Sequence, residues 1–169
     1  MPLSCNIGTS LRSSKKMKRV EVKLSLAVVA PLLDVIKAVG DSLSDELAAP
    51  LPLDQLDADL RGPWREELLA AQNADVATLL ALFDSEFFSS GVVGFDGDNA
   101  EAIVRACASV RLRLREKFLS DLPDDMLEGG DVMVEDLEEQ TRKAFLCYLF
   151  LATVQELIIQ HLDASILGG

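Results

Sequence analysis

Carboxylates gather in one short segment, Asp96-Gly-Asp98-Asn99-Ala-Glu101, and oxygen ligands of this kind suit a hard cation such as calcium. A calcium-binding EF-hand loop needs Gly at its sixth position and Glu at its twelfth. Counted from Asp96, these positions hold Glu101 and Cys107. The same residues also fit a helix start, because Asp98 or Asn99 could cap a helix whose positive end attracts acids. The segment therefore predicts a helix N-terminus and leaves Asp96, Asp98 and Glu101 as candidates for a hard-metal or small-ligand site.

Residues for soft metals or nucleophilic catalysis are few. His161 is the only histidine, and Cys5, Cys107 and Cys147 form no Cys-x-x-Cys pair, which argues against a zinc site and a disulfide framework. Cys107 and Cys147 lie in apolar helical stretches, where burial would raise the thiol pKa and make them inert. Neither Gly-x-Ser-x-Gly nor His-Glu-x-x-His occurs. The sequence therefore favours a protein without catalysis and predicts no catalytic residue and no cofactor.

Three glycines, Gly91, Gly94 and Gly97, precede the same helix start at a spacing of three. This spacing matches neither Gly-x-Gly-x-x-Gly nor the P-loop pattern. Asp96 and Asp98 would also repel a phosphate that approached the helix. We therefore expect a turn-rich loop over residues 91–97 that binds no phosphate.

Four aromatic residues in the middle third of the chain are candidates for contacts with a partner: Trp64, Phe87, Phe88 and Phe95. Core packing is the simpler explanation for most of them. Phe87 and Phe88 are consecutive, however, and neighbouring positions of a helix do not face the same seam. One of this pair is therefore expected to cover a loop or to face a partner.

The charges are unevenly distributed along the chain. The formal net charge is −12, yet residues 1–19 contain five basic side chains and no acid. The remaining 150 residues carry 11 basic and 28 acidic side chains, a net charge of −17. A body this acidic repels phosphate backbones and anionic lipid surfaces, so we expect neither nucleic acid nor membrane as a partner. A solvated surface that keeps the protein soluble is the simplest interpretation, and an acidic surface also suits a basic partner.

Residues 1–19 are predicted to be a basic extension that does not fold, because they are rich in Ser and Lys and lack periodicity. Met17 is a plausible alternative start. Glu21 and Lys23 interrupt the apolar stretch that follows, which argues against a secretory signal. The three cysteines agree with a reducing compartment. We therefore expect a cytoplasmic protein with a single helical domain over residues 20–165 and a flexible tail over residues 166–169.

Hydrophobic periodicity predicts the elements of this domain. Alternation over residues 20–26 is typical of a half-buried strand, and apolar spacings of three and four predict a helix over about 27–47. Residues 48–63 hold three prolines and are a predicted connector, with Pro63 opening a short helix over 64–72. Asn73 or Asp75 could cap a further helix that ends before Gly91. Further helices are expected over about 99–119 and 135–162, with a short strand at 132–134.

The last predicted helix contains eleven consecutive uncharged residues, 144–154. A membrane span needs about 20 apolar residues, so this run is too short to cross a bilayer. A helix that is apolar on all sides is surrounded by protein. The sequence therefore predicts a mostly α fold, a helical bundle of four or five helices with residues 144–154 at its centre. One small two-stranded β element would pair residues 20–25 with 132–134.

The order of these elements resembles that of a bacterial protein family, DUF2017. The similarity lies in the opening strand and helix from Val20, and in the segment Gly130-Asp-Val-Met-Val-Glu-Asp136 that enters the last helix. It covers about residues 20–162 and is a pattern of hydrophobicity and length. The chain departs from the family in its last helix, which lacks a Leu-Asn-Asp-Leu-Arg-like run. The resemblance implies no activity, cofactor or site residue.

Two functions from different classes follow from these observations. The first is a cytoplasmic protein–protein interaction or scaffold module without catalysis, whose partner is another protein or a second copy in a homodimer. It is motivated by a mean hydropathy of +0.22 in a chain with no catalytic signature. The alternative is a small-ligand or hard-metal binding protein that uses the carboxylates near residues 96–101.

Overall fold

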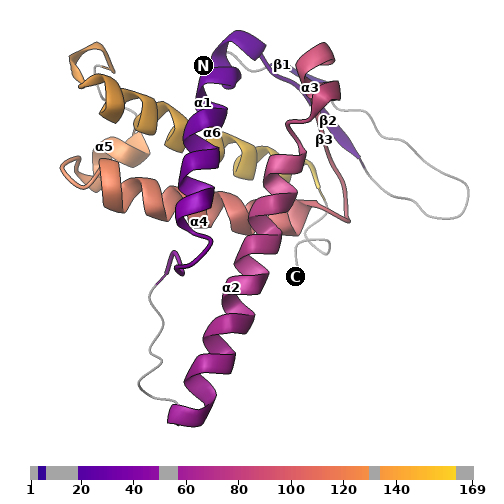
Figure 1. Ribbon diagram of the computed structural model, residues 1–169. Helices are drawn as coiled ribbons and strands as arrows, with labels where there is room; N and C mark the ends of the chain where they lie inside the picture. The colour runs from indigo at the N-terminus through magenta and orange to yellow at the C-terminus, as the bar shows by residue number, and fades with distance from the viewer. Residues whose placement is uncertain (1–3, 7–18, 50–56, 130–133, 163–169) are drawn as a thin grey trace, which may run out of the picture.

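The computed structural model describes residues 4–6, 19–49, 57–129 and 134–162 (Figure 1). Within these residues the chain forms four helices of 17 residues or more: α1 (Leu26–Ser42), α2 (Ala58–Ala81), α4 (Ala100–Phe118) and α6 (Glu139–His161). Two six-residue helices, α3 (Ser85–Ser90) and α5 (Asp124–Gly129), and a 3₁₀ turn, η2 (Val134–Asp136), complete the helical part. The predicted mostly α bundle with a small β element is confirmed.

The β element is an antiparallel sheet of three strands in the order β1-β2-β3. Strand β2 (Val20–Lys23) lies between β1 (Ser4–Asn6) and β3 (Val92–Phe95). The predicted alternation of β2 is confirmed, because Val20 and Val22 are buried while Glu21 and Lys23 are exposed. The expectation that residues 1–19 do not fold is wrong for the three residues of β1.

The predicted partner of β2 is wrong. Both edges of β2 are occupied by β1 and β3, which leaves no edge for residues 132–134. Val134 begins the 3₁₀ turn η2, and residues 132 and 133 lie outside the described residues.

The segment predicted as a loop, residues 91–97, contains strand β3. Val93 and Phe95 are buried and alternate with two half-buried residues, so the period of a strand is present but Gly91, Gly94 and Gly97 mask it. Gly91 is the C-cap of α3. Its φ of 75° is a left-handed backbone conformation that favours glycine. The chain therefore turns from α3 directly into the sheet.

Helix α2 replaces part of the predicted connector, the short helix over 64–72 and the first part of the helix expected to end before Gly91. The rest of that helix is wrong as a continuation, because α2 ends at Ala81 and α3 begins at Ser85. Helix α2 starts before Pro63 and continues past both predicted caps. Asn73 donates a side-chain hydrogen bond to the Ser44 carbonyl oxygen, and Asp75 accepts one from Arg105. These side chains make tertiary contacts instead of ending a helix, so the backbone continues without a break. Residues 50–56 of the predicted connector lie outside the described residues.

The centre of the bundle is α4, which packs against α1, α2 and α6. Figure 1 shows α4 and α6 side by side, with α1 crossing both of them. Within the predicted central run, 144–154, seven side chains are buried: Ala144, Phe145, Cys147, Tyr148, Phe150, Leu151 and Val154. The other four are half-buried on the outer face of α6. The run is therefore a major part of the core, although α4 and not α6 is the most enclosed helix.

Helix α6 is also the one helix in the described part of the chain that is long and apolar enough to cross a membrane, with a hydropathy of 1.4. Its buried side chains pack mainly against α4 and α1. The core helix of a bundle meets the same criteria of length and composition as a membrane span. The contacts of α6 are those of a core helix.

Candidate interaction surface

Helix α2 has two halves with different surroundings. All ten residues from 58 to 67 are exposed, whereas the residues from 68 to 81 include the buried Val76 and Leu79. Figure 1 shows that the first part extends away from the other helices. We call residues 58–67 the projecting half and residues 68–81 the docked half.

Two large apolar side chains lie on the projecting half. Leu60 is 54% exposed and Trp64 is 50% exposed. Residues four positions apart lie on the same face of a helix, one turn above the other. Leu60 and Trp64 therefore form a short apolar stripe with about half of its side-chain surface exposed. Trp64 is a candidate from the sequence alone, whereas Leu60 is not, because residue 60 falls in the predicted connector. The spacing of four between them is the signal that could have found it.

The charged residues of the projecting half fall into two groups. Asp59, Glu66 and Glu67 are exposed, and none of them makes a hydrogen bond or ion pair among the described residues. In contrast, Arg65 donates a hydrogen bond to the Asp45 carbonyl oxygen at 2.8 Å. The Arg61 side chain also interacts within the protein. The acids of this half are thus available, while its two arginines interact with the protein itself.

The docked half is fixed by polar contacts to the corner that follows α1. The Gln72 side-chain nitrogen donates to the carbonyl oxygens of Leu43 at 2.8 Å and Glu46 at 3.0 Å, and its oxygen accepts from the Ala48 N–H at 2.9 Å. In the same corner the buried Arg113 of α4 places Nη2 3.2 Å from Glu46 Oε1. Gln72 thus pairs the carbonyl of Leu43, the C-cap residue of α1, together with two backbone groups of the corner that follows.

An ion pair joins the docked half to α4. Arg105 donates to both carboxylate oxygens of Asp75, at 2.9 and 3.0 Å. The hydrogen bond to Asp75 is the main cause that raises the pKa of the Arg105 guanidinium above its ordinary value. Arg105 also lies 2.8 Å from Glu101 Oε1, one turn earlier on α4. Of the predicted metal-ligand candidates, Glu101 is therefore paired with an arginine.

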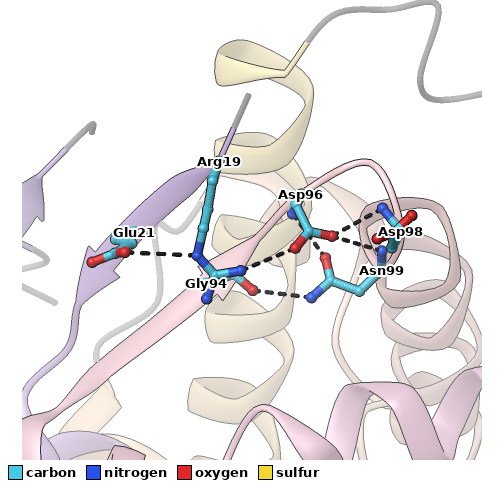
Figure 2. Close-up of polar contacts among 6 residues, drawn as sticks. All are labelled: Arg19, Glu21, Gly94, Asp96, Asp98 and Asn99. Atoms are coloured by element: carbon cyan, nitrogen blue, oxygen red, sulfur yellow. Dashed lines mark hydrogen bonds and ion pairs between the residues drawn. The ribbon is translucent and has the colours of Figure 1, made fainter. Parts of the chain in front are cut away.

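The other candidates for a metal site lie in the turn between β3 and α4 (Figure 2). One Asp96 carboxylate oxygen accepts from the backbone N–H groups of Asp98 and Asn99, and the other accepts from Arg19 at 2.9 Å. Asn99 accepts from the Asp96 N–H and donates to the Gly94 carbonyl oxygen. These contacts hold the turn that starts α4. Asn99 occupies the predicted N-cap position, but its side chain makes no capping hydrogen bond and contacts the turn before the helix instead.

The described residues contain no group of three or more His, Cys, Asp or Glu side chains that could hold a metal ion. Asp96 and Glu101 pair with separate arginines, Arg19 and Arg105. Asp98 is exposed, and its backbone N–H serves the turn. The carboxylates near residues 96–101 therefore do not converge on one point.

The aromatic candidates separate into two classes. Phe87 and Phe95 are buried in the core, whereas Trp64 and Phe88 are about half exposed, at 50% and 52%. Consecutive Phe87 and Phe88 do face different directions, as predicted. The Phe88 ring contacts the Phe87 ring edge-on, with centroids 5.4 Å apart. Phe88 thus lies on the surface beside the core, and Trp64 lies on a helix that projects from it.

Cys107 and Cys147 are buried in the core, and desolvation raises the pKa of each thiol to about 12. Both groups are therefore protonated near neutral pH and are poor nucleophiles.

A separate apolar pocket of about 280 Å³ lies among α1, α4 and α6, lined by Val35, Val39, Phe118 and other residues. Neither this pocket nor the pair of buried thiols brings together a nucleophile, a base and an oxyanion donor, the arrangement that acyl-transfer catalysis needs.

The chain matches no protein-family model, no curated protein and no solved structure. The resemblance to the DUF2017 family therefore stays a prediction.

Proposed function

We propose that this chain is a cytoplasmic protein–protein interaction module without catalysis, and that the projecting half of α2 is its contact surface. The observation that carries the proposal is the pair Leu60 and Trp64, two large apolar side chains about half exposed and one turn apart, on a half of α2 that has no buried residue. Tryptophan is among the residues that contribute most to binding at protein interfaces. The occupant of this surface is another protein or a second copy of the chain.

The energetics of the helix support the same conclusion. Most helix stability in proteins comes from tertiary packing, and the ten residues of the projecting half are all exposed. This half also contains Gly62 and Pro63, which cost about 1 and 3 kcal/mol relative to Ala inside a helix. A partner that covers Leu60 and Trp64 would offset this cost by removing apolar surface from water.

The alternative function, a small-ligand or hard-metal site near residues 96–101, is less well supported. Asp96 and Glu101 already bind arginine side chains, and Asp96 also orders the turn before α4. A cation at this place would have to displace these contacts. We therefore do not develop it further.

Trp64 is the only tryptophan, so fluorescence reports directly on the proposed surface. Self-association through α2 would shift the Trp64 emission to shorter wavelengths as the protein concentration rises, and light scattering would show a dimer. For a heterologous partner, a photo-crosslinking residue introduced at position 60 should give a defined adduct in cells. The matched control is the same residue at position 88, which is equally exposed. A strict monomer with no adduct above this control would contradict the proposal.

A further inference from the structure

The acids of the projecting half are more than a consequence of its position at a helix start. The positive end of a helix dipole favours acids in the first turn, which accounts for Asp59. This effect fades within the first turn, so it does not account for Glu66 and Glu67. Glu67 follows Trp64 by three residues and Leu60 by seven, and therefore borders the apolar stripe. Asp59 and Glu66 are seven residues apart and lie together on the flank beyond it.

The charge that this surface offers to a partner is therefore negative. The three acids and two arginines of the projecting half sum to a charge of −1, and the hydrogen bond from Arg65 to the Asp45 carbonyl oxygen directs that guanidinium toward the corner after α1. The chain as a whole has a net charge of −12, which adds a long-range field of the same sign. An apolar stripe bordered by available carboxylates is complementary to a segment that combines aliphatic side chains with Lys or Arg.

We propose that the projecting half of α2 binds a basic, amphipathic segment of another protein. This inference rests on the proposed function and names its partner class. Aliphatic side chains of the segment would cover Leu60 and Trp64, and its cations would pair with Asp59, Glu66 and Glu67. The apolar contacts hold the complex together, while the charges accelerate encounter and select against acidic partners.

A second copy of the chain fits this surface less well. Two projecting halves with their stripes in contact would bring two molecules of net charge −12 together. Like charges across an interface oppose association. Residues 12–19 of a second copy hold five of its 16 basic residues and no acid, so a peptide of this segment is a necessary competitor in the test.

The experiment measures the binding of three fluorescently labelled, tryptophan-free peptides to the full chain. The first is an amphipathic peptide of Leu and Lys, the second replaces each Lys with Glu, and the third covers residues 7–19 of this chain. Anisotropy gives the Kd, and Trp64 emission shows whether the peptide reaches the stripe. We expect the Leu/Lys peptide to bind most tightly, to shift the Trp64 emission to shorter wavelengths, and to weaken with added salt.

Two charge variants locate the binding. Glu66→Gln combined with Glu67→Gln is expected to weaken binding of the Leu/Lys peptide about tenfold, if each carboxylate forms an ordinary exposed ion pair. The matched control, Asp121→Asn with Asp125→Asn, removes two exposed acids near α5 and should change the Kd less than about twofold, because only the long-range field changes. Circular dichroism checks that both variants keep their helices.

Several results would overturn the inference. Equal binding of the Leu/Glu peptide would remove the role of charge, and equal weakening by the control variant would place the binding elsewhere. Tighter binding of the peptide covering residues 7–19 would identify a second copy as the occupant. If no peptide binds but Trp64 emission still shifts with protein concentration, the proposed function stands and this inference fails. If no peptide binds, no shift occurs and no adduct forms at position 60, both fail.

Discussion

The two halves of helix α2 are continuous in backbone but differ in what holds them. The docked half contributes Val76 and Leu79 to the core, and its polar side chains bind the corner after α1 and helix α4. The projecting half has no buried residue, and its largest side chains, Leu60 and Trp64, face solvent. A helix that needed only to support the bundle could end near residue 68. The proposed function assigns these additional turns to contact with another molecule.

The largest expected effect comes from removing a core side chain of the docked half. Leu79 is fully buried, so Leu79→Ala should lower the free energy of unfolding by about 2–5 kcal/mol, through lost burial and a residual cavity. The same change in the projecting half, Leu60→Ala, should stay within about 0.5 kcal/mol. Urea unfolding followed by circular dichroism measures both. Similar losses for the two variants would show that the halves are not distinct.

The second effect tests the polar anchor of the docked half. Gln72→Ala removes three hydrogen bonds and leaves part-buried backbone groups of residues 43–48 without a partner. We expect a loss of about 1–3 kcal/mol in the free energy of unfolding, measured in urea. Gln140→Ala, at an exposed position of α6, is the control and should have little effect. An unchanged stability of the Gln72 variant would mean that water replaces these contacts.

The third effect concerns the core that the docked half completes. Burial raises the pKa of the Cys107 and Cys147 thiols to about 12 from the ordinary value of 9.0. The folded state therefore keeps each thiol neutral, and the stability is fully present below pH 9 and decreases as the pH rises above it. Between pH 8 and pH 10 each thiol should cost about 1–2 kcal/mol of stability.

The measurement compares the wild-type chain with the variant Cys107→Ala Cys147→Ala by urea unfolding at several pH values. The other titrating groups are common to both proteins, so the difference between the two curves isolates the thiols. Parallel curves between pH 8 and pH 10 would contradict the assignment of both thiols to a dry core. In a Cys5→Ser background, both thiols should also react with a thiol reagent only after unfolding.

These contrasts also mark what the sequence could predict. Periodicity located the helices and strand β2 because each has one buried face, as in Val20 and Val22. It could not choose the partner of β2, since pairing depends on which distant segment reaches its edge, and the glycines hid β3. It broke α2 at Asn73, because cap residues and tertiary hydrogen-bond donors have the same side chains.

The candidate surface was predictable only in part. Trp64 stood out by its type, but its exposure follows from how far α2 extends beyond α4, which is a property of tertiary packing. Phe87 is buried and Phe88 is exposed, although both are phenylalanines. Spacing alone could not decide which of the two is buried. The pairing of Asp96 with Arg19 joins positions 77 residues apart. No local pattern indicates such a contact.

A smaller effect sharpens the boundary between the halves. The Asp75–Arg105 pair lies near the start of the contact with α4, with Arg105 about half exposed. A double-mutant cycle with Asp75→Asn and Arg105→Gln should give a coupling energy of about 0.2–1 kcal/mol that falls with added salt. No coupling at low salt would mean that apolar packing alone docks this part of α2.

The smallest expected change in stability is that of Trp64→Ala, within about 0.5 kcal/mol, because the side chain is half exposed and lies on a half of α2 that has no buried residue. Phe88→Ala is the matched control and should cost somewhat more, because its ring contacts Phe87. For binding to a partner, Trp64→Ala should have the larger effect of the two variants. Trp64→Ala should weaken association with a partner about tenfold or more, whereas Phe88→Ala should leave it unchanged. A residue that matters little for folding and much for association belongs to a surface kept for a partner. If Trp64→Ala unfolded the chain, the projecting half would instead be part of the folding unit, and the distinction between the two halves of α2 would be lost.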